Sequence, residues 1–514
     1  MQHSWFIDTP FEVKLPRTDF YSLYKEVRNG ARRYNPESIV RMAMRELYEP
    51  VPNKLEDLRR APWQILLLVK WICQDDAQDP RAPDITFDAF YTLRQAIWSM
   101  PERLVSGIGD TLPGYLFFRQ LLHAQAAMQR RFSTGFVREA AILLQQDRNH
   151  PLRKMFNEKT GLRLNDFVDL AFALYCGLLE GKRTFSADWF RPLTAHYSAK
   201  TINTFASVVS RTVPELTGFC RALPDAHRKL ASELFQFPVL ARYPFLRTGT
   251  VIECWHPAVF YRGMESLVHN VLSEAGQDYM GRFSKIFERH VLDEAKRVPA
   301  QVFTEEAIKS WLPAQSKVPD GLLSYPTCNV FVESKAGMFD DSVMTVGHTG
   351  IFADRTRAIQ DAIGQGWAAS TGLRQRGSAP ETVRNAPKDY LLIVTNRELS
   401  AGRGTALQLM YPPETLIPPD TMAAIHLPVD HIYVLSIEDF ERFAASAAQG
   451  EIDVPAFLAD CVANDSESAS SVFYFEQHLD RARTPRRVSE LVHQAVGDSV
   501  RRLEKALGRE LPIT

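Results

Sequence analysis

The stretch "VPDGLLSYPTCNVFVESKAG", residues 318–337, contains two short apolar segments separated by a turn that includes proline. Apolar segments bounded by turn residues are typical of buried strands, so we expect two neighbouring strands here. Glu333 and Lys335 stand at the end of the second segment, although ionised side chains are rarely buried without a partner. Because side chains two positions apart on a strand share a face, these two should project side by side.

Asp320 supplies a second carboxylate for the same place. It begins the first expected strand, thirteen positions before Glu333, and an antiparallel pairing would bring the two carboxylates together. Two carboxylates at one strand end repel each other unless a cation lies between them, and oxygen ligands favour Mg²⁺ or Mn²⁺. Lys335 would then orient the nucleophile or offset charge on a phosphate oxygen. The alternative is a solvent-facing ion pair on an edge strand, with Asp320 in a turn.

The "PD" that ends at Asp320, followed by Glu333, Ser334 and Lys335 on an apolar strand, resembles the motif of the PD-(D/E)XK nuclease superfamily. The resemblance extends over roughly residues 265–445. It implies a restriction-endonuclease-like α/β domain, with a mixed central sheet flanked by helices, that cleaves phosphodiester bonds with Mg²⁺. In that pattern Asp320 and Glu333 bind the metal, the carbonyl of Ser334 adds a ligand and Lys335 positions the attacking hydroxide.

A helix before the motif is expected to add a third acid. The segment "FSKIFERHV" is similar to a family helix that often contributes a glutamate, which implies that Glu288 is a metal-site residue that holds a metal-bound water. Ser284 and His290 stand where the family usually has glycine and tyrosine. Glu305 and Glu306 are alternatives for the third acid, and they fit equally well as first-turn acids of a helix.

Further residues after the motif are candidates for substrate contacts. The helix "RTRAIQDAIGQGW" resembles the family's next helix, on which Gln360 or Gln365 would face the site. His348 would approach the scissile phosphate or simply lie in a turn. Arginines in or near loops are expected to bind the nucleic-acid backbone, or to be solvated loop residues. These arginines are Arg355, Arg357, Arg374, Arg376, Arg384, Arg397 and Arg403.

The chain of 514 residues is long enough for several domains. Residues 1–240 show helical periodicity almost throughout and predict an all-α region, whereas residues 241–514 predict the α/β domain and a C-terminal amphipathic helix. The six cysteines are scattered and should be reduced core residues. We expect a cytoplasmic protein with no membrane partner, because the sequence has neither a secretory signal nor an apolar stretch of about 20 residues.

A formal net charge of -1 excludes a strongly basic protein, so nucleic-acid contacts must come from local patches. The expected activity is that of a Mg²⁺-dependent endonuclease acting on DNA, with RNA as the alternative substrate. A helical region fused to a nuclease resembles the layout of bacterial anti-phage defence proteins, in which a phage-derived or other protein trigger binds the front half. A homo-oligomer is compatible with this layout. The alternatives are an inactive nuclease-fold scaffold or binding module, and a repair or recombination nuclease.

Overall fold

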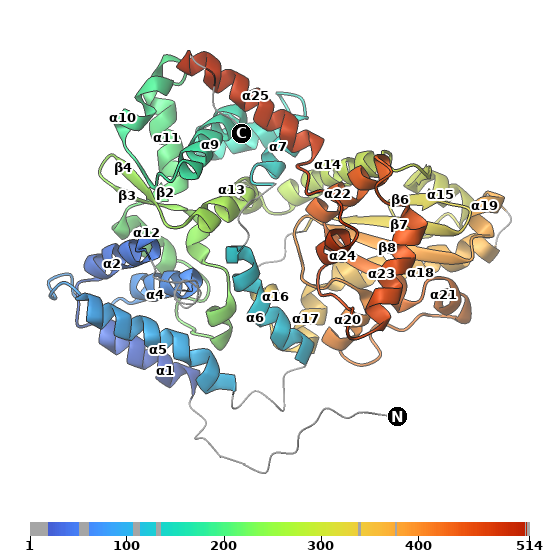
Figure 1. The fold of residues 1–514 in the computed structure, drawn as a ribbon, viewed down its shortest axis with the longest axis horizontal. Coiled ribbons are helices and arrows are strands. Elements are labelled where there is room, and N and C mark those ends of the chain that lie inside the picture. The colour runs from blue at the N-terminus through green and yellow to red at the C-terminus, as the bar shows by residue number, and fades with distance from the viewer. Residues whose placement is uncertain are drawn as a thin grey trace, which may run out of the picture. The chain divides into compact units, whose positions relative to one another are not determined.

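The computed structural model describes residues 19–50, 61–105, 114–129, 135–337, 341–375, 378–508 and 510. These residues are mostly helical and include two small mixed sheets (Figure 1). The expected combination of a helical region with an α/β region is therefore observed at this coarse level. In the described segments no helix has both the length and the apolarity that a membrane crossing requires. No disulfide joins the six cysteines, which all lie in described segments, and five of them are buried.

The chain divides into two compact units, which differ from the predicted division at residue 240. The first unit comprises residues 1–112 and 219–234, and the second comprises residues 113–218 and 235–514. In the described residues of the first unit, the apolar periodicity produces the helices α1 (Phe20–Ala31), α2 (Pro36–Tyr48), α4 (Pro62–Gln74) and α5 (Phe87–Val105).

The second unit contains a helical layer and a small sheet. This sheet has the order β1-β4-β3-β2, and its strands are β1 (Thr184–Phe185), β2 (Ser210–Arg211), β3 (Phe245–Thr248) and β4 (Val251–Cys254). Because β1 and β2 lie within residues 1–240, the prediction that this region is all-α is wrong at these positions. The C-terminal helix packs against α7, α9 and a short 3-10 helix, as its amphipathic pattern predicts. The helices used below are α6 (Gly114–Gln129), α7 (Arg138–Leu144), α8 (Pro151–Thr160), α9 (Leu164–Leu179), α11 (Ala199–Val209), α13 (Pro257–Leu272), α14 (Gln277–Ala295) and α25 (Glu490–Leu507).

The larger sheet has the order β5-β6-β7-β8-β9 (Figure 1). Its first three strands are antiparallel, and β8 and β9 continue parallel to β7. The strands are β5 (Gln301–Thr304), β6 (Gly321–Ser324), β7 (Cys328–Lys335), β8 (Lys388–Thr395) and β9 (Ile432–Ser436). Strands β6 to β9 lie where the apolar segments predict them. The sequence does not predict strand β5, because the whole segment "VFTEEAIKSWL" has a helical pattern. Only its second part is a helix, α15 (Glu305–Trp311), and its first three residues belong to β5.

Helices cover both faces of this sheet. Val332 of β7 joins a hydrophobic cluster with Phe287 of α14 and with residues of α22 (Ile437–Ala448). On the other face, a Cβ atom at Gly366 of α18 (Arg357–Gln375) would lie 2.8 Å from a methyl carbon of Leu391, so α18 packs tightly on β8. Leu391 pairs with Phe331 in the parallel ladder. The alternation of side chains along β7 therefore directs Glu333 toward the face that α18 covers.

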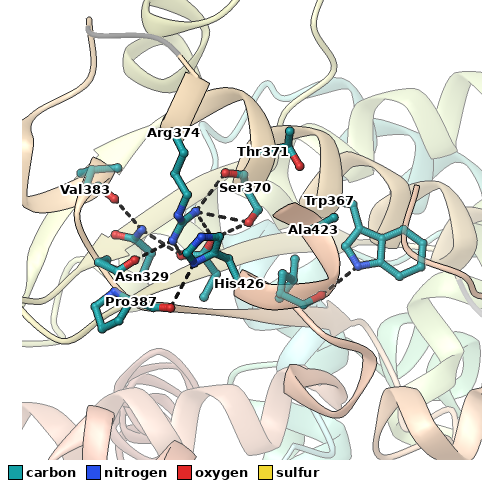
Figure 2. A network of polar contacts seen from close by, with 12 residues as sticks. Asn329, Trp367, Ser370, Thr371, Arg374, Val383, Pro387, Ala423 and His426 are labelled. Carbon is teal, nitrogen blue, oxygen red and sulfur yellow. Dashed lines mark hydrogen bonds and ion pairs between the residues drawn. The ribbon is translucent and has the colours of Figure 1, made fainter. Parts of the chain in front are cut away.

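A buried polar network fixes the last turns of α18 to the sheet (Figure 2). Arg374 donates from both terminal nitrogens to the carboxylate of Asp389, at 2.6 and 2.8 Å, and Asn329 donates to the same carboxylate at 2.9 Å. Asn329 and Asp389 lie near the starts of β7 and β8. The prediction that Arg374 is a loop residue that binds phosphate is therefore wrong, since its guanidinium is held inside the fold. The first turn of α18 must lie toward the other end of the strands.

Candidate metal centre and active site

Asp320 and Glu333 meet across β6 and β7, as the sequence predicts. The antiparallel register that pairs Gly321 with Val332 places these two residues opposite each other. The amide nitrogen of Asp320 donates to Glu333 Oε2 at 3.1 Å. In return, Asp320 Oδ2 accepts hydrogen bonds from the backbone nitrogen and the hydroxyl of Ser334, at 2.7 and 2.6 Å. The two carboxylates are thus held in fixed orientations by neighbouring main-chain groups.

Burial makes it unfavourable for Asp320 and Glu333 to be ionised together without a bound cation. Glu333 is only 3% exposed, and burial, together with the charge of Asp320, raises its pKa to about 7. Burial also raises the pKa of Asp320, while hydrogen bonds from Ser334 and the charge of Lys335 oppose this shift. The ammonium group of Lys335 contacts Glu333 Oε1 and offsets part of the negative charge. A divalent cation at this place would remove most of the penalty of ionising both acids.

The alternative arrangement, a solvent-facing ion pair on an edge strand with Asp320 in a turn, is not observed. Strand β7 lies between β6 and β8 rather than at an edge, and Glu333 is buried rather than facing solvent. Asp320 Oδ2 accepts from Ser334 on the neighbouring strand instead of closing a turn on its own backbone. The pair of Glu333 with Lys335 is therefore a buried feature of a central strand, where its ionisation is costly without further compensation.

Glu288 shares the electrostatic field of this site. It lies half-buried on α14, and its pKa is raised by burial and then by the charges of Asp320, Glu305 and Glu306. Within the described segments, no three His, Cys, Asp or Glu side chains converge closely enough to form a ready metal site. The two oriented carboxylates fit Mg²⁺ nonetheless, because this ion commonly takes one or two carboxylates and keeps several waters. Glu288 then suits contact through water.

The predicted accessory residues have different surroundings. Gln360 lies in the first turn of α18, at the end of the sheet where β7 terminates, and donates to the carbonyl of Ala353 at 2.6 Å. The Oε1 atom of Gln365 is buried and has no hydrogen-bond partner in the described residues. His348 is an exposed helix cap whose ring nitrogen accepts from the backbone nitrogen of Gly350 at 3.2 Å, so the turn alternative describes it.

The remaining arginines do not form one phosphate-binding surface. Arg355 and Arg357 are exposed, as expected for such a role. Arg403 instead pairs with Asp465 at 2.8 Å and is largely buried, so the prediction that it binds nucleic acid is wrong. Arg376 lies outside the described residues. Two further arginines also make internal contacts: Arg384 donates to the carbonyl of Ala379, and Arg397 donates to the hydroxyl of Ser266.

Two features near the site were not predicted. Arg282, Lys285 and Arg289 are exposed on α14, the helix that carries Glu288, at the spacing that places residues on one side of a helix. This stripe could have been found by applying the helical period to charges as well as to apolar residues. The second feature is Asn396, whose backbone nitrogen donates to the carbonyl of Lys335 at 3.2 Å and whose amide donates to Glu139 at 3.1 Å.

Comparison with family models, with curated proteins and with solved structures finds no match for this chain.

Proposed function

We propose that this protein is a metal-dependent endonuclease whose active centre lies at the end of β7. The observation that carries the proposal is the cross-strand arrangement in which the buried Glu333 and the half-buried Asp320 lie together beside Lys335. The mixed sheet with helices on both faces is compatible with the fold that the PD-(D/E)XK resemblance implies. The chemistry argues in the same direction, because paired carboxylates and one ammonium suit cleavage of a phosphodiester.

Each residue of the proposed centre has a distinct task. Asp320 and Glu333 would hold Mg²⁺ or Mn²⁺, with the carbonyl of Ser334 as a further ligand. The bound ion supplies a Lewis acid and a more acidic water. The two hydrogen bonds from Ser334 fix the orientation of Asp320. Lys335 orients the nucleophile and offsets charge on the phosphate, and Glu288 accepts a proton from water at the edge of the site.

The proposed substrate is DNA. Its phosphates repel a protein with no net positive charge unless cations gather near the site. The exposed stripe of Arg282, Lys285 and Arg289 lies on the same helix as Glu288 and supplies such cations. Replacing Lys285 and Arg289 by glutamate should weaken binding of a DNA duplex by about tenfold and reduce its salt dependence, without abolishing metal binding.

The decisive experiment is a cleavage assay with matched variants. Purified protein is incubated with plasmid, linear DNA and RNA in Mg²⁺, in Mn²⁺ or in EDTA. Wild type should cut only with metal, and Asp320→Asn and Glu333→Gln should be inactive. Glu381→Gln is the control, because Glu381 is an exposed acid to which we assign no role. Cutting in EDTA, or equal cutting by the variants, contradicts the proposal. Inactivity on every substrate favours an inactive scaffold instead.

The layout of the chain also supports a proposal for its cellular role. A helical unit joined to a nuclease supports a role as an anti-phage effector, with a protein trigger acting on residues 1–112 and 219–234. Bacteria that express the wild type should then resist phage infection, and bacteria that express Glu333→Gln should not. Equal plaque counts for the two strains, with a wild type that cuts DNA in vitro, would favour repair or recombination.

A further inference from the structure

A cavity lies in the helical layer of the second unit. It has a volume of about 780 Å³ and is lined by residues of α7, α8, α9 and α25 together with the turn before α8. Small-molecule sites in proteins commonly measure ~300–1,000 Å³. None of the residues of the proposed nuclease centre lines this cavity. Its size and its separate lining make it a candidate site for a ligand other than the nucleic-acid substrate.

Two of the acids in the cavity wall are already neutralised. Asp166 forms a two-pronged ion pair with Arg163, with hydrogen bonds of 2.8 and 2.9 Å. Asp169 accepts two hydrogen bonds from Arg502, at 2.7 and 2.6 Å, and another from the hydroxyl of Ser499. These contacts join α9 to α25 and make one wall rigid. They also leave little negative charge on that wall for a bound cation.

The wall formed by α8 and the turn before it carries three cations and one acid, Glu158. Arg148, Arg153 and Lys154 line the cavity, and none of them lies within ion-pair distance of a carboxylate in the described segments. Arg153 is half-buried and donates to the carbonyl of Gln146 at 2.8 Å and to the amide oxygen of Asn165 at 3.1 Å. Burial lowers the pKa of Arg153, the charge of Arg148 adds to this shift, and the charge of Asp147 opposes it.

The position of these cations is unfavourable for the protein alone. Arg153 and Lys154 lie in the first turn of α8, and that turn contains no acid, although Glu158 follows in the next turn. The positive end of a helix dipole repels cations in the first turn and favours anions. The neighbouring cap, His150, also lies in a positive field, because burial and then Arg282, Arg153 and Arg289 lower its pKa. A bound anion would offset this accumulated positive charge.

We propose that this cavity binds a nucleotide-sized ligand that carries phosphate. The phosphates would lie against Arg148, Arg153 and Lys154, since guanidinium and ammonium groups bind phosphate through charge-assisted hydrogen bonds. A bare phosphate would leave most of the cavity empty. The side-chain amides of Asn157 and Gln494 also line it and supply donors and acceptors for a sugar or a base. The proposal goes beyond the nuclease assignment and does not depend on it.

The test is a calorimetric titration of the full chain in EDTA with ATP, GTP, AMP and pyrophosphate. Arg148→Glu and Lys154→Glu are the variants, because both side chains are exposed and their replacement should leave the fold intact. The matched control is Lys200→Glu. Lys200 is an exposed cation in the first turn of α11, and it does not line the cavity. At least one nucleotide should bind the wild type, each cavity variant should weaken it by about tenfold or more, and the control should not.

Three results would overturn the proposal. The first is that no nucleotide binds the wild type, and the second is that both cavity variants bind as tightly as the control. The third concerns a 20-nucleotide single-stranded DNA, titrated in parallel. If Arg148→Glu and Lys154→Glu weaken only this DNA, the surface belongs to the nucleic-acid substrate. Cleavage by the same variants is measured separately, so that failure of the nucleotide site and failure of the nuclease assignment give different results.

Discussion

A carboxylate buried at the end of a central strand, as Glu333 is, costs stability whenever it ionises without a metal. Glu333→Gln keeps the size and an acceptor oxygen but removes the charge. We therefore expect the variant to lose at least about 10²-fold in cleavage rate. In EDTA at pH 8 it should unfold at the same temperature as the wild type or higher, because burial raises the pKa of Glu333 to about 7.

Cleavage rates and thermal unfolding in EDTA measure these two quantities on one preparation. A variant that loses activity and also unfolds at a lower temperature would mean that Glu333 serves the fold rather than the reaction. Glu381→Gln should change neither quantity, because its carboxylate is exposed and lies outside the proposed active centre.

Lys335 gives an independent prediction. Lys335→Met removes the ammonium group beside Glu333 but keeps a side chain of similar length. Because no metal ligand is changed, Mn²⁺ should still bind, whereas cleavage should fall by about 10²-fold or more. Calorimetric titration with Mn²⁺, alongside a rate measurement, checks this division. Loss of Mn²⁺ binding together with activity would show that Lys335 holds the site together instead of acting on the substrate.

Local geometry explains which site residues could be predicted from the sequence. Glu333 and Lys335 were found because strand spacing fixes their faces, and Asp320 was found because a short turn allows only a few antiparallel registers. The internal partners of the arginines could not be predicted from the sequence. Arg403 pairs with Asp465, which lies 62 positions away, and the sequence shows the charge of each residue without its partner.

At the scale of elements, side chains of α6 anchor the backbone of the segments that follow β7 and β8. Arg119 of α6 is fully buried and donates to the carbonyls of Val343 at 2.6 Å and Leu399 at 2.9 Å. Gln120 donates to the carbonyl of Thr345 at 2.6 Å. Residues 343–345 follow soon after Lys335, so α6 holds the chain that leaves the proposed active centre.

Arg119→Met should therefore affect both stability and cleavage. The variant leaves buried carbonyls without donors, which should lower the free energy of unfolding by about 2–4 kcal/mol. Cleavage should fall as well, because residues 343–345 lose an anchor. Urea titration and hydrogen exchange in these residues measure the two effects. Phe118→Ala is the control, since Phe118 is 60% exposed on the same helix. Unchanged exchange at residues 343–345 would contradict the anchoring role.

Element length decided which parts of the fold were predictable. Long amphipathic helices such as α25 and apolar strands such as β8 carry enough periodic positions to be recognised. Strands β1 and β2 of the small sheet contain two residues each, too few for a pattern. Strand β5 was missed because helix α15 begins at the next residue and its first-turn acids dominate the local pattern.

At the scale of the molecule, buried polar pairs explain why residues 113–218 belong to the same unit as the sheet. Arg138 of α7 bonds Glu441 of α22 at 3.0 Å, and His290 of α14 bonds the same carboxylate at 2.9 Å. Arg138 and Glu441 are separated by 303 positions in the chain. A boundary read from composition falls near residue 240, where helices give way to strands. It cannot detect that an early helix is bonded to a late one.

A second junction of this kind joins α7 to α13 and to the loop after β8. Glu139 accepts from the amide of Asn396 at 3.1 Å and from the backbone nitrogen of His269 at 3.0 Å. Burial raises the pKa of Glu139 to about 6, with Arg397 opposing and Glu265 reinforcing the shift. Burial, and then Arg397, lowers the pKa of His269 to about 4. This ring also contacts the hydroxyl of Tyr279 at 2.9 Å.

These two shifts act on stability in opposite directions. Between about pH 4.5 and pH 6 the folded state holds a proton on Glu139 that the unfolded state releases, so the contribution of Glu139 falls as pH rises. For His269 the unfolded state binds the extra proton between about pH 4 and pH 6.5, so its contribution rises with pH. In the wild type, the contributions of Glu139 and His269 to the pH dependence of the free energy of unfolding largely cancel. Removing one of these groups should therefore make the pH dependence caused by the other measurable.

Urea titrations at pH 4.5, 5.25 and 6 can separate the two groups. The stability advantage of the wild type over Glu139→Gln should shrink by about 1 kcal/mol across this range, because the variant lacks the falling contribution. The advantage over His269→Gln should grow by about 2 kcal/mol over the same range, since that variant lacks the rising contribution. Differences that stay constant with pH would mean that this junction does not titrate as a buried acid beside a buried imidazole. If one stability difference shrinks and the other grows as the pH rises, a proton-dependent contact joins the early helices to the sheet that carries the proposed active centre.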